Sequence, residues 1–198
     1  NPGIDITFVY EGSAKLVNQI EQGATPDLLI TADTKNMDKA TNDKLVAGEP
    51  TLFASNTLQI AVPPKNPKGI NSLADLTKPG LKVVICAPQV PCGSATKTVE
   101  KAAKVTLKPA SEESSVTDVL NKVTAGEADA GLIYRTDVAG ADGKVEGIDF
   151  AQSSEAVNKY PIAALSSSKQ ADLAKQFIAL VTGTAGQKVL ADAGFAKP

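Results

Sequence analysis

The chain has 198 residues, 42% of them hydrophobic, and a formal net charge of −2. These values suit one large or two small hydrophobic cores and exclude disordered and fibrous classes, and no apolar run is long enough to span a bilayer. The 20 lysine and arginine residues are spread along the chain, so no basic face indicates binding to nucleic acid or a membrane surface.

Strand-like and helix-like segments alternate along the first half of the chain. In order, the patterns predict a strand at 5–10, a helix at 13–23, a strand at 26–33, a helix at 34–46 and a strand at 57–64. The first helix has Leu16, Val17 and Ile20 on one face, begins at a serine cap and ends at Gly23.

The second half continues the alternation. In order, the predicted segments are a short helix at 72–76, a strand at 81–87, helices at 93–104 and 115–126, strands at 130–134, 147–151 and 160–166, and helices at 170–183 and 184–195. Such alternation is typical of α/β proteins, with helices on both faces of mostly parallel sheets. The proline-flanked strands at 57–63 and 160–165 are suited to cross between two lobes, one built from the middle of the chain and one from its two ends.

The residue types restrict the chemistry. Without histidine, the chain has no Ser-His-Asp or Cys-His arrangement and no HExxH metal motif. Its two cysteines, Cys86 and Cys92, cannot supply the roughly four ligands of a zinc site. They flank a strand-to-helix turn, where they could form a disulfide or remain buried thiols, and Cys92 could be a reactive nucleophile at a helix start.

Three predicted helices begin with small or hydroxyl residues: "YEGSAKL" (10–16), "VPCGSAT" (90–96) and "EESSVTD" (112–118). A helix start offers free backbone amides and about half a positive charge. Helix capping explains such residues one by one, whereas three starts that converged on one cleft would bind an anion without charged side chains.

Five segments in a fixed order indicate a family. They are "GSAKLVNQIEQGATPDLLITADTKNMDKA" (12–40), "VPCG" (90–93), "AGLIYRTD" (130–137), "YPIAAL" (160–165) and "GQKVLADAGF" (186–195). Together they resemble the periplasmic molybdate-binding proteins of ABC importers, and the resemblance covers nearly the whole chain.

The resemblance implies a type II periplasmic-binding-protein fold. Its two α/β lobes would comprise residues 1–61 with 160–198, and residues 62–159, with the ligand cleft between them. The implied function is an extracytoplasmic, non-enzymatic binding component, periplasmic or a cell-surface lipoprotein and monomeric. It would deliver molybdate or tungstate to a membrane permease without a cofactor.

The resemblance also implies the ligand set. Ser13 and Tyr134 would donate from their hydroxyls, and Cys92 and Val116 from their backbone amides, all to oxygens of the oxyanion rather than to its metal. The Cys92 sulfur would then form a disulfide with Cys86 that holds the loop. Sulfate or another small oxyanion is the alternative ligand within this fold, and a Cys92-dependent enzyme is the alternative from another class.

The sequence departs from the family pattern at its start. The family begins with a strand ending in Ala-Ala-Ser-Leu and a helix, and that serine also contacts the anion. The present sequence begins where the family's second strand begins. We therefore expect it to be a fragment of a longer protein.

Overall fold

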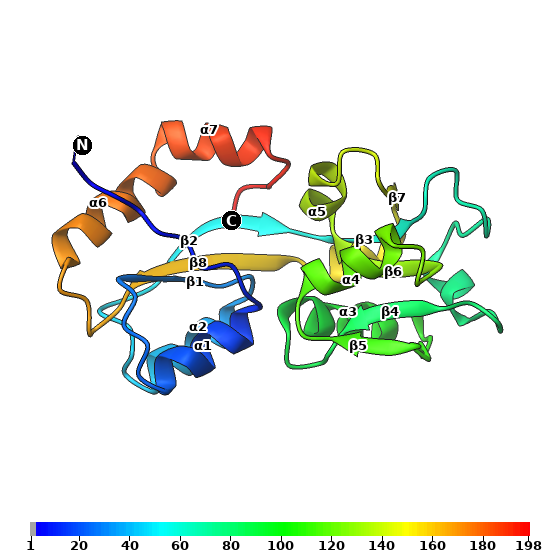
Figure 1. Ribbon diagram of the computed structural model, residues 1–198, viewed down its shortest axis with the longest axis horizontal. Coiled ribbons are helices and arrows are strands. Elements are labelled where there is room, and N and C mark those ends of the chain that lie inside the picture. Colours follow the sequence, from blue (N-terminus) through cyan, green and yellow to red (C-terminus); the bar gives the residue numbers. More distant parts are fainter. Residues whose placement is uncertain (1–2) are drawn as a thin grey trace.

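The computed structural model describes residues 3–198 and shows two β-sheets with helices packed around them (Figure 1). Residues 1 and 2, which the sequence analysis assigns to the first lobe, lie outside the described residues. The helices are α1 (Ser13–Glu21), α2 (Thr34–Asn42), α3 (Pro91–Ala103), α4 (Val116–Thr124), α5 (Arg135–Gly140), α6 (Ala171–Thr182) and α7 (Thr184–Asp192), with 3-10 helices η1 (Leu73–Thr77) and η2 (Ala151–Glu155). The strands are β1 (Leu28–Ile30), β2 (Thr51–Asn56), β3 (Leu58–Val62), β4 (Val83–Cys86), β5 (Ser111–Glu113), β6 (Ala130–Tyr134), β7 (Glu146–Ile148) and β8 (Asn158–Ala164).

The smaller sheet has three strands in the order β1-β8-β2, so its central strand comes from late in the chain. Successive side chains of a strand point to opposite faces. Accordingly, Ala163 of β8 packs in one cluster with Val17 of α1 and Met37 of α2, while Tyr160 and Ile162 pack toward α6 and α7. Figure 1 shows the two helix pairs on opposite sides of this sheet.

The larger sheet has five strands in the order β5-β4-β6-β3-β7, all from the middle of the chain. β4 runs parallel to β5 and β6, whereas β3 is antiparallel to β6 and β7, as β8 is to β1 and β2. The expectation of mostly parallel sheets is therefore wrong outside β5-β4-β6. In the antiparallel pair of β3 and β6, Leu58 at the start of β3 lies opposite Tyr134 at the end of β6.

The chain passes between the sheets twice. Only Thr57 separates β2 from β3, so the first crossing lies at Asn56–Leu58. The chain returns between η2 and β8, which runs antiparallel to β2. Figure 1 shows β2 and β3 as one long path from the smaller sheet into the larger one.

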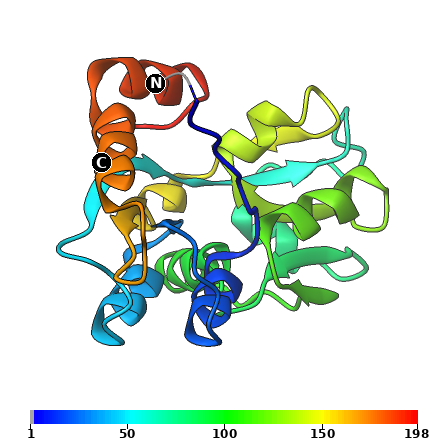
Figure 2. The same cartoon turned by 60° about the vertical axis from the view of Figure 1, so that its left-hand side comes forward.

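The segment at 5–10 was predicted to be a strand, and that prediction is wrong. It forms no strand, and its apolar side chains are exposed, with Phe8 at 53% and Tyr10 at 84%. A strand needs a neighbour to pair with, and within residues 3–198 β1 pairs with β8 instead of this segment. Phe8 stacks on Tyr10 and contacts Phe177 of α6, and Figure 2 shows the segment passing the α6–α7 side before it reaches α1.

Candidate functional site

Ser13 lies at the start of α1, but it is not the helix cap. Gly12 occupies the cap position, and Ser13 is the first helical residue. Its buried hydroxyl oxygen accepts a hydrogen bond from the backbone N–H of Ala32 at 3.0 Å. A hydroxyl that accepts one bond still has its own proton to donate. Ser13 is thus fixed against the turn between β1 and α2, and within residues 3–198 its own hydroxyl proton is not used in a hydrogen bond.

The start of α1 meets the start of α4. A Cβ placed on Gly12 would lie only 2.5 Å from the carbonyl oxygen of Ser114, so this position has room only for glycine. Ser115 caps α4 by accepting the backbone N–H of Asp118, which makes Val116 the first helical residue. The amide of Val116 is one of the first-turn donors that lack a partner within the helix. Two helix starts, one beside each sheet, therefore adjoin.

α3 begins at Pro91, two residues earlier than the sequence pattern predicted, because proline is favoured at the first helical position. Cys92 therefore lies inside the first turn. Bonding within this helix starts with the N–H of Ser94, which donates to the carbonyl of Val90 at 2.9 Å, so the amide of Cys92 precedes it. A Cβ on Gly93 would lie 1.9 Å from the carbonyl oxygen of Ala87, so the loop and the helix start are in close contact.

The predicted disulfide between Cys86 and Cys92 is confirmed, and both residues are buried. It joins the end of β4 to the first turn of α3 and closes the loop between them. Because the Cys92 sulfur is bonded, it is not a free nucleophile, and the hypothesis of a Cys92-dependent enzyme is wrong.

A cavity of about 330 Å³ connects the start of α2 with the first turns of α3. Its walls come from these two helix starts and from the returning crossing: Asp33, Thr34, Lys35, Pro91, Ser94, Ala95, Thr98, Glu155, Ala156, Val157, Asn158 and Lys159. Asp33 caps α2, and its carboxylate accepts bonds from both the backbone and the side-chain amide of Asn36. Asn158 holds the turn before α2 by donating to the carbonyl of Ala32 at 2.8 Å.

Tyr134 ends β6 and is buried, with 3% of its surface exposed. Its hydroxyl is the buried side-chain polar atom, among residues 3–198, that makes no hydrogen bond. Burial raises the pKa of Tyr134 well above its ordinary value, and the nearby Tyr160, Asp33 and Asp137 raise it further. Tyr160 is thus close to this hydroxyl without forming a hydrogen bond of normal geometry to it. Tyr134 therefore stays neutral, and its hydroxyl has no hydrogen-bond partner within residues 3–198.

Two carboxyl groups near this hydroxyl were not recognised as site residues in the sequence. Asp33 lies within the family-like segment at 12–40, and Asp137 ends the segment "AGLIYRTD". Asp137 accepts the backbone N–H of Tyr134 at 3.0 Å. Burial raises the pKa of Asp137 to about 6, although that hydrogen bond acts in the opposite direction.

Two of the four residues expected to bind the anion, Ser13 and Tyr134, lie near the turn at Ala32–Asp33. Ser13 bonds to Ala32, and the charge of Asp33 raises the pKa of Tyr134. Asp33 also lines the same cavity as the first turn of α3, the turn that contains Cys92. Val116 joins through the contact of its helix start with that of α1. Within residues 3–198, no hydrogen bond joins one of the four side chains directly to another.

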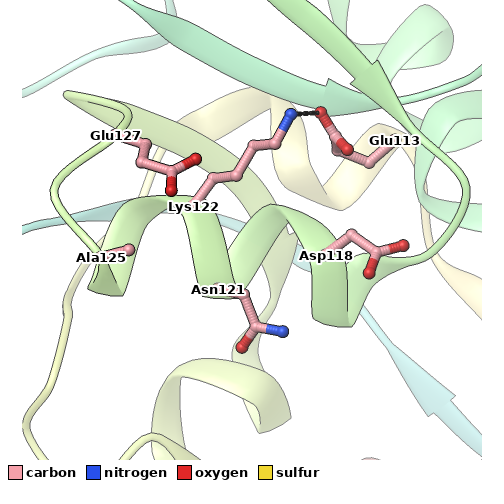
Figure 3. Close-up of a pocket in the computed structure, with 6 residues that line it drawn as sticks. All are labelled: Glu113, Asp118, Asn121, Lys122, Ala125 and Glu127. Carbon is pink, nitrogen blue, oxygen red and sulfur yellow. Dashed lines mark hydrogen bonds and ion pairs between the residues drawn. The ribbon is translucent and has the colours of Figure 1, made fainter.

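A second hollow, of about 270 Å³, lies on the surface of α4 (Figure 3). It is lined by Glu113, Asp118, Asn121, Lys122, Ala125 and Glu127. The ammonium group of Lys122 is paired with Glu113 at 2.5 Å. With its cation paired and carboxylates around it, this hollow does not suit an anion.

Comparison with known proteins shows the family of this chain. Residues 1–196 match the family described as bacterial extracellular solute-binding protein. The chain belongs to this family. Among relatives, it is 50% identical over 198 residues to the molybdate-binding protein ModA of Mycobacterium tuberculosis, covering 100% of the chain and 76% of the relative.

Solved structures show the same fold as this solute-binding protein. The periplasmic molybdate-binding protein of Azotobacter vinelandii superposes with a TM-score of 0.84 at 21% identity, covering 100% of this chain and 89% of that one. The sulfate-binding protein SubI of M. tuberculosis gives a TM-score of 0.81 at 18% identity, covering 99% and 77%. The predicted α/β periplasmic-binding-protein fold is confirmed.

Membership in this family means that the chain binds a solute and is not an enzyme, so it works without a cofactor. The family is described as extracellular, which agrees with the expected extracytoplasmic location. Among residues 3–198, none of the helices combines the length and the apolar character needed to cross a membrane.

Proposed function

We propose that this protein is the molybdate-binding component of an ABC importer. The observation that carries the proposal is the buried Tyr134 hydroxyl, which lacks a hydrogen-bond partner among residues 3–198 and lies near Asp33, in the turn to which Ser13 bonds. The relationship to the ModA protein of M. tuberculosis supports molybdate as the anion. Tungstate, nearly equal to molybdate in size and shape, would bind comparably.

The proposed donors are neutral. The hydroxyls of Ser13 and Tyr134 and the backbone amides of Cys92 and Val116 would each bond to an oxyanion oxygen. A hydrogen bond to a charged group contributes about 1.5 to 3 kcal/mol, and the three helix starts add partial positive charge. Four such bonds would outweigh the cost of ordering the ligand without burying cations that would also have to lose water.

Selectivity would follow from the proton state of the ligand. Monohydrogen phosphate carries an O–H group that needs an acceptor, and a pocket of donors leaves it without one. Asn36 donates to both oxygens of the Asp33 carboxylate, which directs that carboxylate into the cap of α2. Sulfate has the same charge and shape as molybdate but is smaller, so it is the competing candidate, and the fold shared with SubI is compatible with it.

The two lobes of the proposal follow the sheets. The family resemblance implies one lobe of residues 62–159 and another of residues 1–61 with 160–198. Because β3 pairs within the five-stranded sheet, we place the first boundary at the crossing Asn56–Leu58 rather than after residue 61. The monomer would carry its anion between the lobes, outside the cytoplasm, to the permease.

Calorimetry tests this proposal. The chain is titrated with molybdate alone, with tungstate, and with molybdate in the presence of a hundredfold excess of sulfate or phosphate. We expect molybdate and tungstate to bind, and neither competitor to displace them. Displacement by sulfate would make the protein a sulfate-binding protein, and absence of binding by both molybdate and tungstate would refute the proposed function.

A further inference from the structure

Tyr160 lies in β8, the central strand of the smaller sheet, and is buried among aromatic rings. Its ring meets those of Phe195, Tyr134 and Phe53 edge to face, at centroid distances of 5.4, 6.0 and 6.3 Å. Phe53 and Tyr160 belong to one sheet, whereas Tyr134 belongs to the other. The contact between the two tyrosines is therefore an aromatic contact from sheet to sheet.

Phe195 comes from the tail that follows α7, and this tail is firmly attached. Ala196 and Ser55 exchange two backbone hydrogen bonds, at 2.8 and 3.0 Å, and the Ser55 hydroxyl donates to the carbonyl of Lys197 at 2.5 Å. Ser55 lies one residue before the first crossing between the sheets. A Cβ on Gly194 would lie 3.7 Å from the side chain of Thr136 in α5, so the tail also reaches the helix that follows Tyr134.

The position of the Tyr134 hydroxyl depends on how its ring is packed. No hydrogen bond holds this hydroxyl among residues 3–198, so the neighbouring side chains determine where it points. Edge-to-face pairs prefer a defined ring orientation, and Phe195 supports Tyr160 against the smaller sheet. A donor that is already oriented binds more tightly than one that must be ordered by its ligand.

We propose that Tyr160, supported by Phe195 of the C-terminal tail, is a positioning residue that orients the Tyr134 hydroxyl toward the anion. The inference rests on the proposed function for its effect on affinity. It assigns the tail a part in ligand binding although none of the proposed donors belongs to it.

The test is a double-mutant cycle of Phe195→Leu and Tyr134→Phe, with molybdate affinity measured by calorimetry. Phe195→Leu should weaken binding about two- to tenfold, the range of one aromatic pair. In the Tyr134→Phe background it should change affinity by less than about twofold, because no hydroxyl remains to be positioned. Phe177→Leu is the matched control. Phe177 packs in the same cluster, but among the ring contacts within residues 3–198 it meets Phe8 and not Tyr160, so its replacement should leave affinity unchanged.

Two further measurements separate positioning from loss of stability. Tyr160→Phe keeps the ring and should weaken binding less than Tyr160→Leu. The three tyrosines can be labelled with carbon-13. Phe195→Leu should then shift the NMR ring signals of Tyr134 but not those of the exposed Tyr10. Equal effects of Phe195→Leu in both backgrounds, or an unshifted Tyr134 ring, would overturn the inference. If the unmutated chain binds no molybdate, the proposed function fails separately, and the ring signals alone decide this inference.

Discussion

Replacing Tyr134 by phenylalanine should change ligand affinity and stability in opposite directions. The variant removes one donor to a dianion, and a hydrogen bond to a charged group contributes about 1.5 to 3 kcal/mol. Molybdate affinity should therefore fall roughly ten- to more than a hundredfold. The ring remains, so its contact with Tyr160 is preserved.

The same hydroxyl should destabilise the free protein. It is buried and makes no hydrogen bond among residues 3–198, and an unsatisfied buried polar group costs about 1 to 3 kcal/mol. Tyr134→Phe should therefore raise the free energy of unfolding without ligand by about 1 kcal/mol or more. A tyrosine that served only to pack the interface would show no such gain combined with a loss of affinity.

Calorimetry with molybdate and urea unfolding without it measure the two effects. Tyr10→Phe is the control, since Tyr10 is 84% exposed and the same atom is removed there. It should change neither quantity. If Tyr134→Phe binds molybdate as tightly as Tyr10→Phe does, Tyr134 does not contact the anion and the proposed site is wrong.

Three further predictions concern the surroundings of the anion. Ser13→Ala deprives the Ala32 amide of its acceptor and should lower both the free energy of unfolding, by about 1 to 3 kcal/mol, and molybdate affinity; unchanged stability in urea would contradict that hydrogen bond. Replacing Cys86 and Cys92 together by alanine should cost about 2 kcal/mol of stability for so short a loop, and mass spectrometry of unreduced protein should find no free thiol; two alkylatable cysteines would disprove the disulfide. Burial raises the pKa of Asp137 from 3.8 to about 6, so its contribution to stability is present below pH 4 and is lost as the pH rises through 6. Asp137→Asn cannot ionise, so this variant should lack the loss of stability with rising pH, which amounts to up to about 3 kcal/mol. If urea unfolding of the variant depends on pH as it does in the unmutated chain, the carboxyl is not buried as described.

Local patterns in the sequence predicted most of the helices and strands. The Ser-Ser start of α4 and the apolar face of α1 are visible within ten residues, and both are present in the structure. β2 was missed because its residues Ser55 and Asn56 are polar and look like a turn. They are in fact buried, because the C-terminal tail pairs with Ser55 and Asn56 donates to Thr136.

The candidate site could be predicted only in part, because its geometry depends on distant parts of the chain. The residue types at the helix starts were visible, but the contact of Gly12 with Ser114 is not encoded in either segment alone. The burial of Tyr160 likewise depends on rings from distant parts of the chain, those of Tyr134 and Phe195. Ser13 resembles a helix cap in the sequence, and only the position of Ala32 shows where its hydroxyl is held.

The central position of β8 has a consequence for how the chain folds. The five-stranded sheet is built entirely from residues 58–148, so it can form as soon as that segment has been synthesised. β1 and β2 are made earlier but do not pair with each other, and each waits for β8 to be inserted between them. Closing a loop of about 100 residues carries an entropic cost of roughly 4 kcal/mol, which the prior folding of the segment inside the loop would reduce. Chains that stop before residue 158 should therefore contain one finished sheet and two unpaired strands, a species prone to aggregate through exposed strand edges.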